Sequence, residues 1–428
     1  MTNLVADARP EPPKWYRWMV LLFISLAMFG NYYLYDSLAP VADLLKEQLG
    51  FTETQYGWLA GAYSWAAIAF LIFGGLMVDR LGTKKSTMIF AVICAVSGFL
   101  MVVTSDYWVM VLGRVLLGIG AEPLIVAITA AIAKWFRGKE LGFALGINLL
   151  VARLGQILAD WSPTWAREAY QHWREPLVLG ALLGLTCVLG AVFYWIMESR
   201  AEGQYALGEA GTSDKLVLSD LVKYNRSFWY ITLLCVAFYS VVFPFRSFAI
   251  KFFIEGHQAE RDFAGQLNSV LPLAAMIATP LFGLLVDRFG KRGSLMAVGT
   301  LLLVPVFPIL AYTHLTLYLP VTMLGITFSL IPAIMWPSVA YLVEQRRLGS
   351  AYALMFLLQQ LGVGALDWLV GKANDYAGAS AANPAGYLPM LWIFTLLGVV
   401  ALGFAVLLWR TETGPKAHGL ETIKVGAE

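Results

Sequence analysis

The sequence predicts an all-α membrane protein with twelve transmembrane helices, arranged as two pseudo-symmetric halves of six helices each. Three observations lead to this fold class: the apolar composition, a series of long apolar segments, and a loop that occurs twice. Hydrophobic residues make up 59% and charged residues 14% of the 428 positions, against roughly 45 to 50% and about 25% in soluble domains. At about 20 apolar residues per membrane crossing, the chain has room for twelve spans and no separate soluble domain.

Short polar segments separate the expected spans. The spans cover residues 15–38, 56–79, 84–104, 107–134, 140–164, 175–197, 227–254, 264–287, 294–314, 316–342, 347–372 and 386–410. The polar start of the chain has no cleavage site of the signal-peptide type, so we expect the first apolar segment to remain as a span. The resulting division is an N-terminal half over residues 1–198, a cytoplasmic linker over 199–226, and a C-terminal half with a cytoplasmic tail over 227–428.

The two halves repeat one another in sequence. The segment GLMVDRLGTKK at 75–85 returns as GLLVDRFGKRG at 283–293, and each copy lies between two apolar segments. Four dipeptides also recur at a constant offset of 207 residues, among them Asp160-Trp161 and Asp367-Trp368. Parallel repeats of this kind predict a pseudo-two-fold axis along the membrane normal, with a solute path between the halves.

Lysine and arginine are distributed unevenly between the two sides of the predicted membrane. The side that holds the N-terminus carries 21 of the 30 Lys and Arg residues, and the opposite loops carry six. The positive-inside rule therefore places both termini in the cytoplasm, and we expect a multi-pass protein of the cell (inner) membrane. The other three cations, Arg114, Arg153 and Arg246, lie inside spans.

The sequence predicts neither a cofactor nor a metal site. Its three cysteines fall in apolar segments without metal-ligand spacing, and its four histidines lie in loops, at a span end or in the tail. It contains neither an H-E-x-x-H nor a G-x-S-x-G motif, so we do not expect an enzyme. The expected partners are a small-molecule substrate and the lipid bilayer, with no nucleic acid. We expect a monomer, and an accessory subunit stays open.

Glu122 and Arg153 carry charge near the middle of the membrane. They lie ~18 Å and ~20 Å from the cytoplasmic ends of their spans at about 1.5 Å per residue. An ionised side chain at that depth costs at least roughly 2.5 kcal/mol unless it is paired or faces water. The repeat replaces the two residues with Ser329 and Gln360, which keep hydrogen-bonding capacity and lose the charges. Either Glu122 and Arg153 pair with each other, or they bind the ammonium and carboxylate ends of a zwitterion.

Further charges lie closer to the opposite side of the membrane. We expect Asp36 and Arg114 to form an ion pair within the first half. Arg246 is then left to contact Asp160 or Asp367 as part of a gate, or to bind an anionic substrate group.

Other residues are candidates for the solute path and for gating. Trp65 and Trp336 fall in mid-span beside small or polar residues, and Tyr33 lies in an unusually polar stretch of the first span. These positions suit a water-exposed cavity wall. The repeated loops place four charged residues where helices from the two halves meet, and such contacts, worth roughly 0.3 to 1 kcal/mol, can break and re-form during gating. The four candidate gating residues are Asp79, Arg80, Asp287 and Arg288.

The duplicated loop resembles the signature loop of the major facilitator superfamily, and RVLLGIG at 114–120 resembles that superfamily's R-x-x-x-G-x-G motif. A second set of motifs is similar to the lysosomal dipeptide transporter branch: Tyr35-Asp36, Tyr63-Ser64-Trp65, 118–122, 135–141, 152–155, Phe243-Pro244-Phe245, Asn268-Ser269-Val270 and Trp336-Pro337.

This resemblance implies a twelve-helix transporter that moves dipeptides by facilitated diffusion, with Glu122 binding the ammonium and Arg153 the carboxylate. Arg246 departs from the branch, which carries an apolar residue there. The departure leaves two alternatives open: proton-coupled transport of an organic or inorganic anion such as a monocarboxylate or nitrate, and drug efflux.

Overall fold

The computed structural model describes residues 9–136, 138–208, 224–415 and 417–424, and it is all-helical as predicted. The first half contains α1 (Lys14–Asp36), η1 (Ala39–Val41), α2 (Ala42–Leu49), α3 (Glu53–Leu81), α4 (Thr83–Val103), α5 (Tyr107–Phe136), α6 (Leu141–Asp160), α7 (Ser162–Trp165), η2 (Arg167–Gln171) and α8 (Arg174–Gln204). The second half contains α9 (Arg226–His257), α10 (Arg261–Phe289), α11 (Arg292–Leu303), α12 (Val306–Tyr312), α13 (Tyr318–Leu342), η4 (Gln345–Arg347), α14 (Leu348–Ala377), η5 (Pro384–Tyr387) and α15 (Leu388–Glu412).

Twelve membrane spans can be assigned within the described residues. Eleven helical segments are long and apolar enough to cross a membrane, and α3, which bends by 55° between Phe70 and Phe73, is the twelfth. The expected span over 294–314 consists of two helices, α11 and α12, with Pro305 at the N-cap of α12. The helix breaks here because proline has no backbone N–H to donate to the preceding turn. The predicted linker over 199–226 falls largely outside the described residues, and α8 extends into it as far as Gln204.

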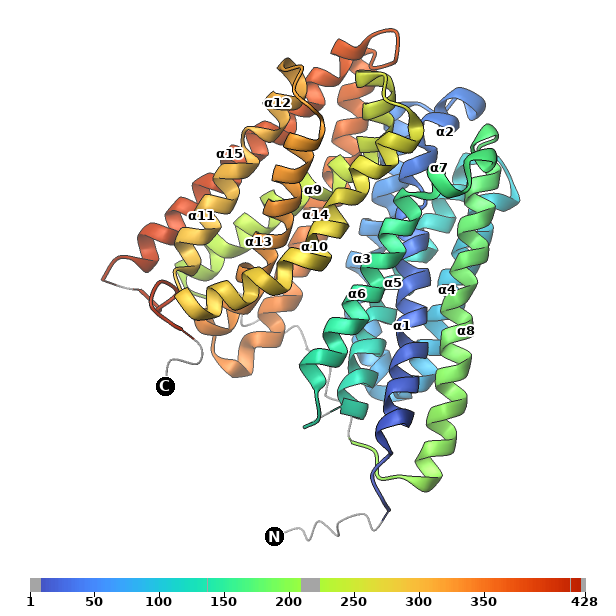
Figure 1. Cartoon of the computed structure of the whole chain (residues 1–428), viewed down its shortest axis with the longest axis vertical. Coiled ribbons are helices and arrows are strands. Elements are labelled where there is room, and N and C mark those ends of the chain that lie inside the picture. Colours follow the sequence, from blue (N-terminus) through green and yellow to red (C-terminus); the bar gives the residue numbers. More distant parts are fainter. Residues whose placement is uncertain (1–8, 137, 209–223, 416, 425–428) are drawn as a thin grey trace.

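The helices form two bundles, α1 to α8 and α9 to α15 (Figure 1). The bundles contact each other through two equivalent helix pairs, α3 with α14 and α6 with α10. They lie close together at the end that carries α2 and α7 and farther apart at the end where both termini lie (Figure 1). We call the end that carries α2 and α7 the opposite side, and the end where the bundles are farther apart the terminus side.

Glycines bring the backbones of the two bundles together on the opposite side. A Cβ at Gly57 in α3 would lie 2.2 Å from the carbonyl oxygen of Asp367 in α14. The repeat builds the same contact elsewhere, because a Cβ at Gly265 in α10 would lie 2.2 Å from the carbonyl oxygen of Asp160 in α6. The shared contact confirms that the sequence repeat corresponds to a repeated packing arrangement, and only glycine fits it.

Ion pairs reinforce this seam. Lys251 of α9 contacts Glu53 of α3, and Lys46 of α2 lies 2.8 Å from Glu53 and 3.5 Å from Glu255. Arg261 of α10 forms a two-pronged contact with Asp43 of α2. Within the described residues, six ion pairs join the two halves toward the opposite side or at the buried Arg246 cluster described below.

We predict that Gly57→Ala opens the opposite side, because the added methyl group forces α3 away from α14. Ser269 is buried in the seam, where its hydroxyl accepts a 2.6 Å hydrogen bond from Trp161 of the other half. A Ser269→Cys reporter should therefore react several times faster with a membrane-impermeant maleimide in the Gly57→Ala background, while the native cysteines are buried.

Gly146→Ala is the matched control, because nothing lies within 4 Å of the Cβ it would add. Equal labelling rates in the Gly57→Ala and Gly146→Ala proteins would contradict the assignment of Gly57 to the closed seam.

Candidate functional site

A cavity of about 430 Å³ lies between the two bundles, within the usual size range of small-molecule sites. Both halves contribute to its wall, through α1, α3, α5 and α6 on one side and α9, α10, α13 and α14 on the other. The lining residues are Asn31, Tyr32, Tyr35, Tyr63, Glu122, Ile125, Leu149, Arg153, Gln156, Tyr239, Phe243, Ala275, Thr279, Phe328, Pro332, Ala333, Trp336, Phe356, Gln359 and Gln360.

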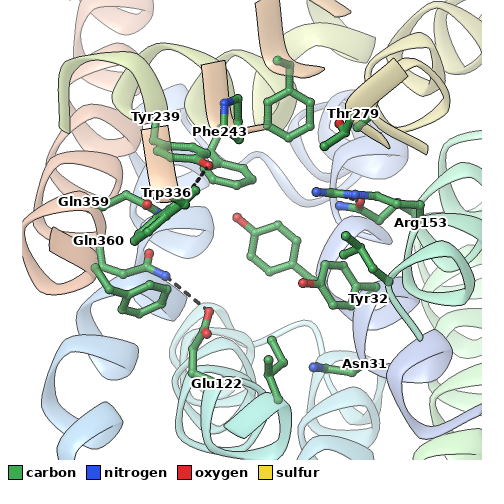
Figure 2. A pocket seen from close by; sticks show the side chains of 18 of the residues that line it. Asn31, Tyr32, Glu122, Arg153, Tyr239, Phe243, Thr279, Trp336, Gln359 and Gln360 are labelled. Atoms are coloured by element: carbon green, nitrogen blue, oxygen red, sulfur yellow. Dashed lines mark hydrogen bonds between the residues drawn. The ribbon is translucent and has the colours of Figure 1, made fainter. Parts of the chain in front are cut away.

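Glu122 reaches the cavity from the middle of α5. Its Oε1 accepts a 2.6 Å hydrogen bond from the hydroxyl of Tyr63 and a 3.3 Å hydrogen bond from the amide of Gln360 in the other half. These two donors fix the carboxylate at the wall, and Figure 2 shows it turned toward the cavity. The structure thus brings together Glu122 and Gln360, two of the residues that the sequence singled out.

Arg153 reaches the cavity from α6. One of its guanidinium nitrogens donates a 2.5 Å hydrogen bond to the side-chain oxygen of Gln156, and the guanidinium lies 5.4 Å from the ring centre of Phe328 in the other half. Glu122 and Arg153 project from different walls of the cavity (Figure 2) and form no ion pair with each other among the described contacts. In this conformation Glu122 and Arg153 therefore do not neutralise each other.

The second half supplies aromatic rings and amides to the wall. The Trp336 indole donates a 3.0 Å hydrogen bond to the Tyr239 hydroxyl, and the Tyr239 and Phe243 rings stack with centres 5.4 Å apart. Gln359 and Gln360 add polar groups from α14 (Figure 2). Among the described lining residues, Glu122 and Arg153 are the only ionisable groups other than tyrosines.

The predicted pair of Asp36 with Arg114 is wrong for this structure. Asp36 instead accepts hydrogen bonds from Arg246 of the other half, at 3.0 Å, and from Gln156, at 2.7 Å. Arg246 also donates a 3.1 Å hydrogen bond to Asp160, so one guanidinium bridges two carboxylates across the halves. The contact of Arg246 with Asp160, one of the gate contacts considered from the sequence, is present.

Arg114 has a supporting role inside the first half. It donates a 3.1 Å hydrogen bond to the carbonyl oxygen of Tyr35 and lies 5.3 Å and 5.8 Å from the ring centres of Tyr35 and Tyr63. Cation–π contacts of this kind hold an arginine and its rings in place. Because Tyr63 donates to Glu122, Arg114 helps to orient the cavity carboxylate.

Four residues expected at the substrate site do not line the cavity. Arg246 is only 3% exposed and lies in the charge cluster just described. Tyr33, 1% exposed, points into the first bundle, and Ser329 is fully buried and donates to the carbonyl oxygen of Gly325 in its own helix. Trp65 is 37% exposed and lies against Trp58 and Gly364 at the edge of the α3–α14 contact.

The four predicted gating residues lie on the terminus side. Asp287 pairs with Arg292 of its own half at 3.2 Å, and Arg288 lies 5.8 Å from the ring centre of Phe289. Asp79 and Arg80 are exposed at the end of α3. Their gating role stays a prediction, because it concerns the conformation in which this side is closed.

Little in the sequence indicated Gln156 or Phe356, which line the cavity. Gln156 lies three residues after Arg153 and four residues before Asp160, so all three residues share one face of α6. Helical spacing from the two charged residues was the available signal for Gln156. Phe356 falls in an apolar segment where nothing distinguishes a wall residue from a core residue.

A charged cavity between two repeated bundles, closed at one end, is the arrangement of a membrane transporter. The chain belongs to the Major Facilitator Superfamily, whose sequence profile matches residues 24–366 and 247–425. It is accordingly a multi-pass membrane transporter of small solutes and not an enzyme.

Two relatives and one solved structure illustrate the similarity. The lysosomal dipeptide transporter MFSD1 of Homo sapiens is 31% identical over 382 residues, which cover 85% of this chain and 81% of that protein. The hexuronate transporter of Escherichia coli is 25% identical over 231 residues, covering 51% of this chain and 53% of that protein. A bacterial homologue of the human lysosomal transporter Spinster, solved inward-facing and occupied, has the same fold with a TM-score of 0.75 at 18% identity, covering 94% of this chain and 98% of that one.

We predict that Arg246→Met lowers the free energy of unfolding by about 3 to 5 kcal/mol, because it leaves two buried carboxylates without a cation. Arg114→Met should cost less, since it removes ring contacts and one hydrogen bond to a carbonyl oxygen. Reversible unfolding of both variants in mixed micelles with dodecyl sulfate measures the difference. The opposite order would restore Arg114 as the partner of Asp36.

Proposed function

We propose that this transporter moves a dipeptide or a related zwitterionic amino compound by facilitated diffusion. In this proposal Glu122 binds the substrate ammonium and Arg153 binds the substrate carboxylate. Trp336, Tyr239, Phe243 and the amides of α14 enclose the rest of the molecule. The 31% identity to the lysosomal dipeptide transporter supports the same substrate class.

The single observation that carries this proposal is the charge balance of the cavity. One carboxylate and one guanidinium line different walls and stay unpaired with each other, and the described wall holds no further formal charge. An ion at bilayer depth without an oppositely charged protein partner needs water or a ligand to complete its stabilisation. A ligand with one positive and one negative end satisfies both groups together, and the guanidinium fork suits a carboxylate.

The direction of opening follows from the side on which the contacts lie. If the terminus side faces the cytoplasm, as the distribution of Lys and Arg indicates, the closed seam faces outward and the structure is open to the cytoplasm. The proposal includes a cell (inner) membrane location, with both termini cytoplasmic as the distribution of Lys and Arg indicates. A monomer is the simplest assembly, because one chain supplies all of the cavity wall described here.

Transport of a simple anion is the alternative, and the hexuronate transporter among the relatives keeps it open. It would require a surplus of positive charge at the site. Arg246, which would supply that surplus, is neutralised by Asp36 and Asp160 outside the cavity. A lone anion would also leave Glu122 unbalanced beside it, so the geometry favours a zwitterion.

We predict that purified protein in proteoliposomes takes up a labelled dipeptide and that neither monocarboxylates nor nitrate compete.

Arg153→Lys should weaken dipeptide binding about tenfold, because a point charge cannot form the two-pronged contact. The matched ligand is the same dipeptide with an amidated C-terminus, which should lose affinity for the wild type and show little further loss in the variant. Equal affinity of wild type and variant for the free dipeptide would remove Arg153 from carboxylate binding.

We predict that Glu122→Gln weakens dipeptide binding about ten- to hundredfold, as expected for the loss of a charge-assisted contact of about 1.5 to 3 kcal/mol. An N-acetylated dipeptide, which lacks the ammonium, should bind wild type and variant equally weakly. In wild-type vesicles the dipeptide should equilibrate and not accumulate under a pH gradient of either sign. Accumulation that Glu122→Gln abolishes would replace facilitated diffusion with proton coupling through Glu122.

A further inference from the structure

A continuous chain of hydrogen bonds leads from the substrate cavity to the closed seam. Arg153 donates to the side-chain oxygen of Gln156 at 2.5 Å, and the Gln156 nitrogen donates to Asp36 at 2.7 Å. Asp36 accepts from Arg246 at 3.0 Å, and Arg246 donates to Asp160 at 3.1 Å. Asp160 in turn accepts from Asn268 of α10 at 2.7 Å. The chain therefore crosses from the first half to the second.

Gln156 is the link between the two parts of this chain. Its amide uses its oxygen toward the cavity arginine and its nitrogen toward the cross-half cluster. It is 2% exposed, yet it contributes to the cavity wall. Arg153, Gln156 and Asp160 occupy successive turns on one face of α6, so a change at the first residue is next to the others.

A substrate carboxylate competes with Gln156 for Arg153. An ionised acceptor forms a stronger hydrogen bond with a guanidinium than a neutral amide oxygen does. Gln156 occupies one of the five N–H donors of Arg153, and a carboxylate that takes this donor displaces the Gln156 oxygen. Once displaced, the Gln156 amide is free to turn, and Asp36 loses the donor that fixes its position opposite Arg246.

We propose that Gln156 is a positioning residue that couples occupancy of Arg153 to the cross-half contacts of Asp36, Arg246 and Asp160. In the empty site Gln156 ties Arg153 to the closed seam. A bound carboxylate releases this tie and so favours opening on the opposite side, which is what a carrier needs between loading and release. The identity of the carboxylate ligand rests on the proposed function, whereas the tie in the empty protein does not.

Gln156→Leu tests the proposal with the Ser269→Cys reporter at the seam. Without ligand, the variant should label about ten times faster than the wild type, because Asp36 has lost a hydrogen bond to a charged group. A dipeptide should accelerate labelling in the wild type and produce no further acceleration in the variant. The dissociation constant for the dipeptide should be unchanged or lower in the variant, since Arg153 has lost its competitor.

Asn148→Leu is the matched control. Asn148 is a buried amide on the same helix that donates to Ser25 of α1 at 3.1 Å and lies outside the chain of contacts. It should label like the wild type with and without dipeptide. Gln156→Asn, whose amide is one carbon shorter, should reproduce the effect of Gln156→Leu while keeping a polar side chain.

Three results would overturn the proposal. The first is a labelling rate of ligand-free Gln156→Leu equal to that of the wild type, and the second is an acceleration of labelling by the dipeptide in that variant as large as in the wild type. The third is weaker dipeptide binding by the variant, which would make Gln156 a substrate ligand. Failure of the proposed function gives a different pattern, with no dipeptide response in the wild type. The labelling of the ligand-free proteins then still decides whether Gln156 ties the cavity to the seam.

Discussion

Arg246 is the buried cation on which the joining of the two halves depends. It donates to Asp36 and Asp160 of the other half, and all three side chains are at most 5% exposed. Burying any of these charges alone would cost several kcal/mol, and their mutual contacts offset that penalty. Because the three charges contact one another outside the cavity, Glu122 and Arg153 remain available to a ligand.

The seam around this cluster combines close backbone packing with contacts that can be exchanged for water. Gly57 and Gly265 allow the bundles to approach to backbone distance, and the lysine and arginine pairs near the opposite surface add charge complementarity. Lys251 and Glu53 are buried, whereas Lys46 and Arg261 are partly exposed, and pairs of partly exposed charges contribute little net stability each. A seam built from many such contacts closes firmly and still opens without unfolding either bundle, which suits alternating access.

The two halves share a scaffold and differ in chemistry. The contact of Gly57 with Asp367 and that of Gly265 with Asp160 are the same contact in two copies. The first half contributes Glu122 and Arg153, whereas the second contributes Gln360 at the position equivalent to Arg153, together with Trp336, Tyr239 and Phe243. Gln360 donates to Glu122, so the uncharged copy of one site residue supports the charged residue of the other half. Ser329, the copy of Glu122, stays in its helix and takes no part.

The sequence by itself determined the fold class, the repeat and the depth of Glu122 and Arg153, because apolar run lengths, repeats and rise per residue are properties of the chain in one dimension. Only the tertiary structure decided which way each side chain points. Tyr32 lines the cavity and its neighbour Tyr33 faces the bundle interior, since successive helical residues differ by about 100° around the axis. Likewise Asp36, Arg114 and Arg246 lie at similar depth, and the sequence predicted the pair of Asp36 with Arg114, but the packing of α9 against the first half selected Arg246. Depth can be counted along a helix, but direction depends on how the helices are rotated against one another, which packing of the whole molecule fixes.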